Sequence, residues 1–288
     1  MILEKLKNIN YNKSNYICSC FLCYNFFGDN MYGAIIGDLA GSIYEYEQTK
    51  EVKPVIIDKI IEKNSFFSDD TILTIAILDA INNNGNYNEY LRNYINLFSS
   101  YKPDFSPYFK SGFSPGIIKW ASENKIGFSK GNGAMMRISP VGYMFDREED
   151  VINNAISATV CSHNSDEAID SAVKVALTIF YLRHGMSRNE VFDNLDISLK
   201  FAPFIKFNTT CMETIDNCFY VLDKSCDFED AIRKIILLGG DTDTNACIVG
   251  SMAEALFGIE DKLIEEANSK IPREFQKVLV KSKLYNYE

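Results

Sequence analysis

Two short clusters of acidic and hydroxyl side chains are the segments of this sequence best suited to chemistry. The first is Ser68-Asp69-Asp70-Thr71, and the second is Gly239-Gly240-Asp241-Thr242-Asp243-Thr244. Each precedes an apolar stretch with helical spacing, so each is expected at the start of a buried helix. Carboxylate and hydroxyl oxygens are the ligands that hard divalent cations such as Mg2+ and Mn2+ prefer in proteins. The clusters therefore indicate a candidate metal site.

Both clusters also have a purely structural interpretation. Acidic and hydroxyl residues cap helix N-termini and complement the helix dipole, for up to about 1 kcal/mol each. However, carboxylates that are buried without compensation are very costly, and a bound cation removes that cost. If the clusters face each other, they could hold two cations about 3.5–4 Å apart, as in two-metal hydrolytic sites. The sequence alone does not show that they meet.

A glycine-rich stretch at residues 33–47 could supply another carboxylate. Gly33, Gly37 and Gly41 recur every four residues, which in a helix places them on one face and permits close packing against a neighbour. Glu45 follows Gly41 by just over one turn. We therefore expect a tightly packed helix whose end brings Glu45 to the acidic centre.

Two more segments could contact a ligand. Gly131-Asn132-Gly133-Ala134 could present backbone N–H groups to a phosphate at the start of a helix, although a simple glycine turn explains the same residues. His163 stands before a helix, where a histidine is either part of a pocket or a local hydrogen-bond partner.

The elements that must position these groups are predicted to be helices. From residue 31 onward we find no series of short alternating strands separated by hairpin turns, so the fold class is all-α, in one compact domain. Gly239 and Gly240 would end one helix, and another would begin near Thr242. Capping signals mark five further helix starts: Ser68, Ser114 with Pro115, Asn164 with Glu167, Ser187 with Glu190, and Asp227.

The composition limits the possible partners. The chain has 288 residues, with 29 Lys and Arg against 39 Asp and Glu, which gives a net charge of −10. There is no global basic surface for nucleic acid or for an anionic membrane, so an anionic ligand would need a local device such as a metal. No segment is long and apolar enough to cross a membrane. Cysteines scattered singly in apolar patterns favour a reducing, cytoplasmic location.

Residues 1–30 differ from the rest of the chain. A lysine-containing start precedes a mostly apolar run at residues 16–27, which is similar to a secretory signal but lacks an A-x-A-like cleavage site. Cys18, Cys20 and Cys23 lack a nearby fourth ligand for zinc. We interpret residues 1–30 as an N-terminal extension of uncertain role and residues 31–288 as the functional domain.

Five elements in this order resemble the ADP-ribosylglycohydrolase family, which includes the dinitrogenase reductase-activating glycohydrolases. The likeness spans about Met31 to Gly258. The motifs that carry it are GDLAGSIYE at 37–45, SDDT at 68–71, KGNGAMMRISP at 130–140, SH at 162–163 and GGDTDT at 239–244. The resemblance implies a single compact orthogonal helical bundle with a two-metal centre in a cleft.

The resemblance also implies roles for individual residues. Two divalent cations, Mg2+ or Mn2+, would be the cofactors. Candidate metal ligands are Ser68, Asp69, Asp70, Asp241, Asp243 and Thr244, and candidate catalytic residues are Glu45, Asp69 and Asp243. The residues expected to contact ADP-ribose are Gly131, Asn132, Gly133, Ala134 and His163. Ser68 stands where many members carry threonine, which keeps the hydroxyl.

The activity implied is metal-dependent hydrolysis of an N- or O-glycosidic bond, which releases ADP-ribose from a modified protein side chain or a small molecule. Nucleic acid is expected only as an ADP-ribosylated substrate. Two alternatives stay open. A two-metal phosphoester hydrolase is one, although such sites usually use histidine ligands and this chain has two histidines. An inactive ADP-ribose-binding protein is the other. The sequence does not choose between linkages or between the two metals.

Overall fold

The computed structural model describes residues 31–103 and 112–285, and within these ranges the protein is helical. Only two isolated bridges, Phe128 with His163 and Gly131 with Thr210, interrupt the helices and loops of the described residues. The all-α prediction is confirmed. Residues 1–30, with their three cysteines, lie outside the described residues.

The helices of the first half are α2 (Gly33–Gly41), α3 (Glu45–Gln48), α4 (Asp69–Asn82), α5 (Tyr87–Phe98), α6 (Pro115–Ser122), α7 (Gly133–Met136) and α8 (Ser139–Met144). Those of the second half are α9 (Glu148–Val160), α10 (Asp166–Arg183), α11 (Arg188–Asn194), α12 (Cys211–Lys224), α13 (Phe228–Leu237), α14 (Thr242–Phe257), α15 (Asp261–Asn268) and α16 (Arg273–Tyr285).

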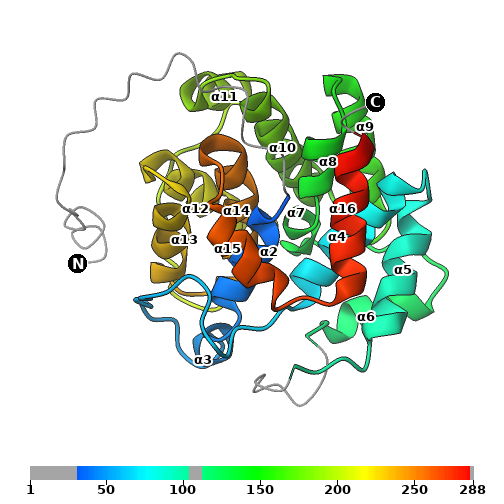
Figure 1. The fold of residues 1–288 in the computed structure, drawn as a ribbon, viewed down its shortest axis with the longest axis horizontal. Helices are drawn as coiled ribbons and strands as arrows, with labels where there is room; N and C mark the ends of the chain where they lie inside the picture. The colour runs from blue at the N-terminus through cyan, green and yellow to red at the C-terminus, as the bar shows by residue number, and fades with distance from the viewer. Residues whose placement is uncertain (1–30, 104–111, 286–288) are drawn as a thin grey trace.

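Helices α2 and α14 lie side by side in the middle of the molecule (Figure 1). A Cβ atom added to Gly33, Gly37 or Gly41 would come within 2.2, 2.0 and 2.2 Å of the carbonyl oxygens of Gly250, Ala246 and Thr242, respectively. The order of these partners shows that the two helices are antiparallel. The predicted close packing of the glycine face is confirmed.

Hydrogen bonds fix both ends of this helix pair. At one end, the buried carboxylate of Glu254 accepts a hydrogen bond from the N–H of Gly33, at 2.6 Å, and complements the positive end of the α2 dipole. At the other end, Thr242 Oγ1 donates to the carbonyl oxygen of Gly41, at 2.9 Å. The C-terminal end of α2 therefore meets the N-terminal end of α14.

Helix α4 is attached to this pair through Asp38, a fully buried residue of α2. Its Oδ2 accepts hydrogen bonds from the N–H of Ser68, at 2.9 Å, and from the N–H and Oγ1 of Thr71, at 3.1 and 2.5 Å. These bonds satisfy orphan donors at the start of α4. Beyond its first turn, α4 is apolar on nearly every side and is covered in turn by α16 (Figure 1), whose Val278 carbonyl accepts from Asn82 Nδ2.

Four of the five predicted helix starts are confirmed, since the side chains of Ser68, Ser114, Ser187 and Asp227 cap their helices. The prediction for Asn164 is wrong. Its N–H donates to the carbonyl of Gly127, at 3.0 Å, which keeps this residue in an extended pairing. Helix α10 therefore begins later, and Ser165 Oγ caps it by accepting from the N–H of Ala168.

The close approach of α2 and α14 makes a specific prediction for stability. A Gly37→Ala variant places a methyl group against the Ala246 carbonyl, and overpacking of this kind costs about 1–3 kcal/mol or more. Urea unfolding of the variant should show at least that loss. Gly116→Ala in α6 is the control, because its nearest atom would be 3.9 Å away, and its stability should stay level or rise. Equal behaviour of the two variants would contradict the packing argument.

Candidate active site

The two acidic clusters meet in a cleft with a volume of about 1200 Å3. Although they are far apart in sequence, Thr244 Oγ1 of the second cluster lies 3.3 Å from Asp70 Oδ2 of the first and donates to it. The predicted residues that line this cleft are Glu45, Ser68, Asp69, Asp70, Gly131, Asn132, Gly133, His163, Asp241, Asp243 and Thr244. Ala134 is fully buried beside them.

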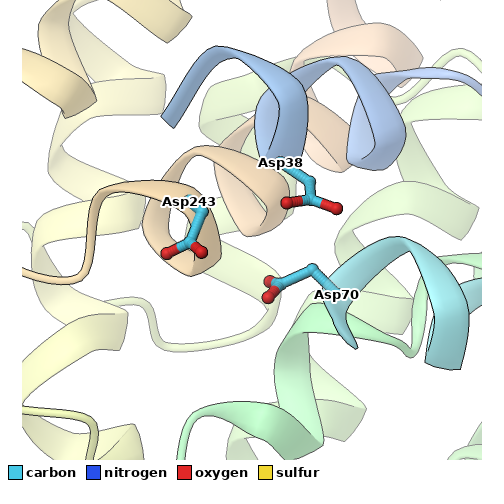
Figure 2. Close-up of side chains that lie close together, drawn as sticks. All are labelled: Asp38, Asp70 and Asp243. Atoms are coloured by element: carbon cyan, nitrogen blue, oxygen red, sulfur yellow. The ribbon is translucent and has the colours of Figure 1, made fainter. Parts of the chain in front are cut away.

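Three buried carboxylates form the floor of the site. Asp38 from α2, Asp70 from α4 and Asp243 from α14 face a common space (Figure 2), and one oxygen of each lies within 4.8 Å of the others. Glu45 and Asp241 form a second group of the same size with Asp243. Asp243 thus belongs to both groups. The prediction that Glu45 reaches the acidic centre is confirmed.

The electrostatics of the floor are unfavourable without a cation. Burial raises the pKa of Asp69 and of Asp241 to about 7, with further contributions from the charge of Asp38 on Asp69 and of Glu45 on Asp241. Burial, followed by the negative charge of Asp243 and its acidic neighbours, raises the pKa of Asp70 well above its ordinary value. The pKa of Asp243 is raised in the same way, by burial and then by Asp241. Mutual repulsion of this kind is what a bound cation relieves.

The donor atoms fit a hard divalent cation. Among the described residues, the buried Oδ1 atoms of Asp38 and Asp70 have no hydrogen-bond partner. Such unsatisfied carboxylate oxygens are costly in a protein interior and are suitable ligands for Mg2+ or Mn2+. The site therefore combines hard oxygen donors with available lone pairs.

Helix capping explains one cluster better than the other. Ser68 is a true cap, because its Oγ accepts from the N–H of Asp70 at 3.2 Å. Asp241 occupies the N-cap position of α14 but makes no capping bond; its Oδ2 instead accepts from Asn132 Nδ2 at 2.7 Å. The carboxylate of Asp241 therefore caps no N–H of its own helix, and the capping interpretation fails for this residue, whereas Asp243 Oδ1 accepts from the N–H of Thr244 in the first turn of α14 at 2.9 Å.

Most N–H groups of the loop at residues 131–134 are hydrogen-bonded within the protein. The N–H groups of Gly131, Asn132 and Ala134 donate to Ser129 Oγ, the Thr209 carbonyl and the Gly131 carbonyl, at 3.1, 2.8 and 3.3 Å. Within the described part of the chain, only the N–H of Gly133 in this loop has no such partner. These bonds favour the simple glycine turn for most of the loop and leave the N–H of Gly133 for a ligand, and the contact of this loop with a ligand stays a prediction.

Two residues of the site were not singled out from the sequence. Asp38 joins the carboxylate floor, and an acid inside the otherwise apolar stretch 33–41 was the signal that could have found it. Arg137 lines the cleft although it is fully buried. It lies within a motif quoted for the family resemblance, but nothing in its spacing indicates where its side chain points.

Comparison with known proteins agrees with this geometry. The sequence model of the ADP-ribosylglycohydrolase family matches residues 29–282 of this chain. The chain belongs to the ADP-ribosylglycohydrolase family. Membership makes it a glycohydrolase of the kind that removes ADP-ribose.

Individual relatives are distant. A protein of Acanthamoeba polyphaga mimivirus, whose name places it among ADP-ribosyl glycohydrolases, is 26% identical over 78% of this chain and 84% of its own. The ADP-ribosylhydrolase ARH3 of Xenopus tropicalis is 25% identical over 58% of this chain, and the match spans only 53% of that protein. A solved structure described as an ADP-ribosylglycohydrolase-related protein complex shares the fold, with a TM-score of 0.67 and 17% identity, over 89% of this chain and 96% of that one.

No helix in the described ranges combines the length and the apolar character needed to span a bilayer.

The raised pKa values predict how the metal-free protein responds to pH. A carboxylate whose pKa is about 3.9 when unfolded and about 7 when folded favours folding while it is protonated, and this contribution is lost as the pH rises through 7. In EDTA, the melting temperature should therefore fall between about pH 5 and pH 8, and Mn2+ should restore it at the higher pH. A metal-free melting temperature that rises over this interval would contradict the assignment.

A second prediction separates metal binding from helix capping. Asp241→Asn keeps the size and capping ability of the residue but removes an anionic oxygen. Loss of an outer-shell group typically lowers metal affinity 10–100-fold, so loss of a ligand should lower Mn2+ affinity by about 100-fold or more in isothermal titration. The metal-free variant should melt at the same or a higher temperature, since one repulsive charge is gone.

The matched control is Asp227→Asn at the start of α13. Asp227 is a working N-cap that accepts from the N–H of Asp230 at 2.7 Å, and it lies outside the cleft. Its replacement by Asn should leave both stability and Mn2+ binding nearly unchanged. If Asp241→Asn behaves like this control, Asp241 is not a ligand.

Proposed function

We propose that this protein is a divalent-metal-dependent hydrolase that releases ADP-ribose from a modified protein side chain or a related small molecule. The observation that carries the proposal is the pair of carboxylate groups that share Asp243 at the floor of a large cleft. Family membership supports the substrate class, and the donor set supports Mg2+ or Mn2+ as the cofactor.

The proposed ligand set is the one that the family resemblance implies, and three of its members, Asp70, Asp241 and Asp243, belong to the two carboxylate groups. We assign Ser68, Asp69, Asp70, Asp241, Asp243 and Thr244 to the metal ligands, as the family resemblance implies. A cation held there would polarise the ribose hydroxyls and lower the pKa of a bound water. Asn132 contributes indirectly, because its side-chain amide donates a hydrogen bond to the Asp241 carboxylate and holds it in place.

Carboxylate side chains of the protein would stabilise the charge that develops on the ribose and deprotonate the attacking water. Cleavage at the ribose C1″ develops oxocarbenium-like charge, which nearby negative side chains stabilise. Glu45 is partly exposed to the cleft, whereas Asp243 is buried, so Glu45 is the group best placed to meet a substrate. We assign to Glu45 the removal of the proton from the attacking water. Asp69, which is also partly exposed, is the second candidate for this role.

The alternative of a two-metal phosphoester hydrolase is less well supported. Neither carboxylate group in the described residues includes a histidine. His163 lies toward the Gly131–Gly133 loop, and His184 caps the far end of α10, where its Nδ1 contacts the Phe180 carbonyl. A set made only of oxygen donors suits sugar hydroxyls and water as further ligands.

Two wider assignments accompany the function. We take residues 31–288 as the catalytic domain and residues 1–30 as an extension; the family match, which begins at residue 29, supports this boundary. We also propose a cytoplasmic location, which the free cysteines among the described residues support. Nucleic acid enters only as an ADP-ribosylated substrate.

The test is release of free ADP-ribose from arginine-, serine- and nucleic-acid-linked substrates, each with Mg2+, Mn2+ or EDTA. At least one linkage should be cut with metal and none in EDTA. Glu45→Gln should lower kcat by about 10²–10⁴-fold, the usual contribution of a general base, while Mn2+ binding is largely kept. The control is Glu47→Gln, two residues away, whose surface ion pair with Lys50 contributes little.

A wild-type protein that binds ADP-ribose but cuts no linkage would point to the inactive binding protein instead. Turnover of a simple phosphoester in place of these substrates would favour the phosphoester hydrolase.

A further inference from the structure

A buried arginine stands behind the histidine of the cleft. Arg137 is fully buried at the end of α7, and its Nη2 donates to the carbonyl of Ala158, at 3.2 Å, and to Ser162 Oγ, at 2.8 Å. Burial lowers the pKa of Arg137 to about 10, so the guanidinium is still protonated at neutral pH. A protonated guanidinium can only donate hydrogen bonds. Ser162 Oγ must therefore accept the bond from Arg137.

This bond decides the direction of the next one. Ser162 Oγ lies 2.7 Å from His163 Nδ1, and one of the two atoms has to supply the hydrogen. If Nδ1 supplied it, the hydroxyl hydrogen of Ser162 would need another acceptor, and none is present among the described residues. Ser162 therefore donates to Nδ1, and Nδ1 is unprotonated.

The other ring nitrogen of His163, Nε2, lies next to the loop at residues 131–133, which lines the cleft. A Cβ atom placed on Gly133 or Gly131 would lie 3.4 or 3.6 Å from His163 Nε2, so the imidazole edge is next to the loop that lines the cleft. Within the described part of the chain, Nε2 makes no hydrogen bond. Burial, and then the positive charge of Arg137, lower the pKa of His163 well below its ordinary value, which keeps the ring neutral.

We propose that Arg137 and Ser162 are positioning residues that hold His163 as the neutral Nε2–H tautomer, so that this histidine donates a hydrogen bond to an acceptor oxygen of the ligand. A phosphate or a ribose oxygen is the chemical class that such a donor binds. The ligand named here rests on the proposed function, whereas the tautomer does not. With its proton fixed on Nε2, His163 is unavailable as the base that deprotonates water, and that task is left to a carboxylate.

Nuclear magnetic resonance of the imidazole nitrogens tests the tautomer directly. The chain has two histidines, so a His184→Gln variant assigns both sets of signals in 15N-histidine-labelled protein. At neutral pH we expect His163 to show a protonated Nε2 and an unprotonated Nδ1. A protonated Nδ1, or a doubly protonated ring, would overturn the proposal.

Variants of Ser162 separate positioning from simple support of the fold. Ser162→Ala removes the donor to Nδ1 and should produce a mixture of tautomers, whereas Ser162→Thr keeps the hydroxyl and should retain the wild-type spectrum. ADP-ribose binding, measured by titration, should weaken about 3- to 10-fold in Ser162→Ala, which is what one neutral hydrogen bond is worth, and recover in Ser162→Thr. The control is Ser225→Ala, another buried serine, whose Oγ donates to the Val221 carbonyl away from the cleft.

An unchanged His163 spectrum in Ser162→Ala would also overturn the proposal, even if binding weakens. The spectrum of the wild-type protein needs no substrate. If the Nε2–H tautomer is present but no ADP-ribosylated substrate is cut, the proposed function fails and the tautomer assignment stands. If a substrate is cut while Nδ1 carries the proton, the function stands and this inference fails.

Discussion

The active site depends on how closely two helices can approach each other. Because α2 presents glycine at every fourth position, its backbone touches the carbonyl oxygens of α14 directly. The antiparallel direction then brings the end of α2 to the start of α14, where Glu45 and Asp243 meet. The same helix carries Asp38, whose bonds to the first turn of α4 fix the remaining acidic cluster. The packing of α2 against α14 therefore places the acidic side chains of three segments, residues 38–45, 68–71 and 241–244.

The protein gives up stability to build this floor. Buried carboxylate oxygens that lack hydrogen-bond partners, such as Oδ1 of Asp38 and of Asp70, are costly in a protein interior. The surrounding helices compensate, because α4 and α14 are buried along nearly their whole length and contribute a large apolar core. Sites where local rules are broken while the rest of the fold obeys them are typically functional. Here the broken rule is charge burial, and Asp70, Asp241 and Asp243 line a large cleft.

Local signals in the sequence predicted the local structure well. The hydroxyl and acidic caps at Ser68, Ser187 and Asp227, and the glycine face of α2, follow from the preferences of single residues and from helical spacing. The errors came from contacts between distant segments. Asn164 is a suitable cap by type, but its pairing with Gly127 keeps it out of the helix. The N–H of Asn132 is likewise taken up by the distant Thr209 carbonyl. The hydrogen-bond partners of Asp38 and Arg137 could not be predicted either, because the spacing of residues along the chain does not show where a side chain points in the folded protein.

The hydrogen bond between Thr242 and Gly41 has a consequence for how this chain can vary in length. Only three residues, which form the turn between α2 and α3, separate Gly41 from Glu45, and an insertion there would shift Glu45 relative to α2. The carboxylate of Glu45 would then leave the cleft while the helix pair stayed intact. The turn that follows α4 at Asn83 and Asn84 is less restricted, because neither residue lines the cleft. Natural insertions and deletions among homologous chains should therefore avoid the first segment and accumulate in the second.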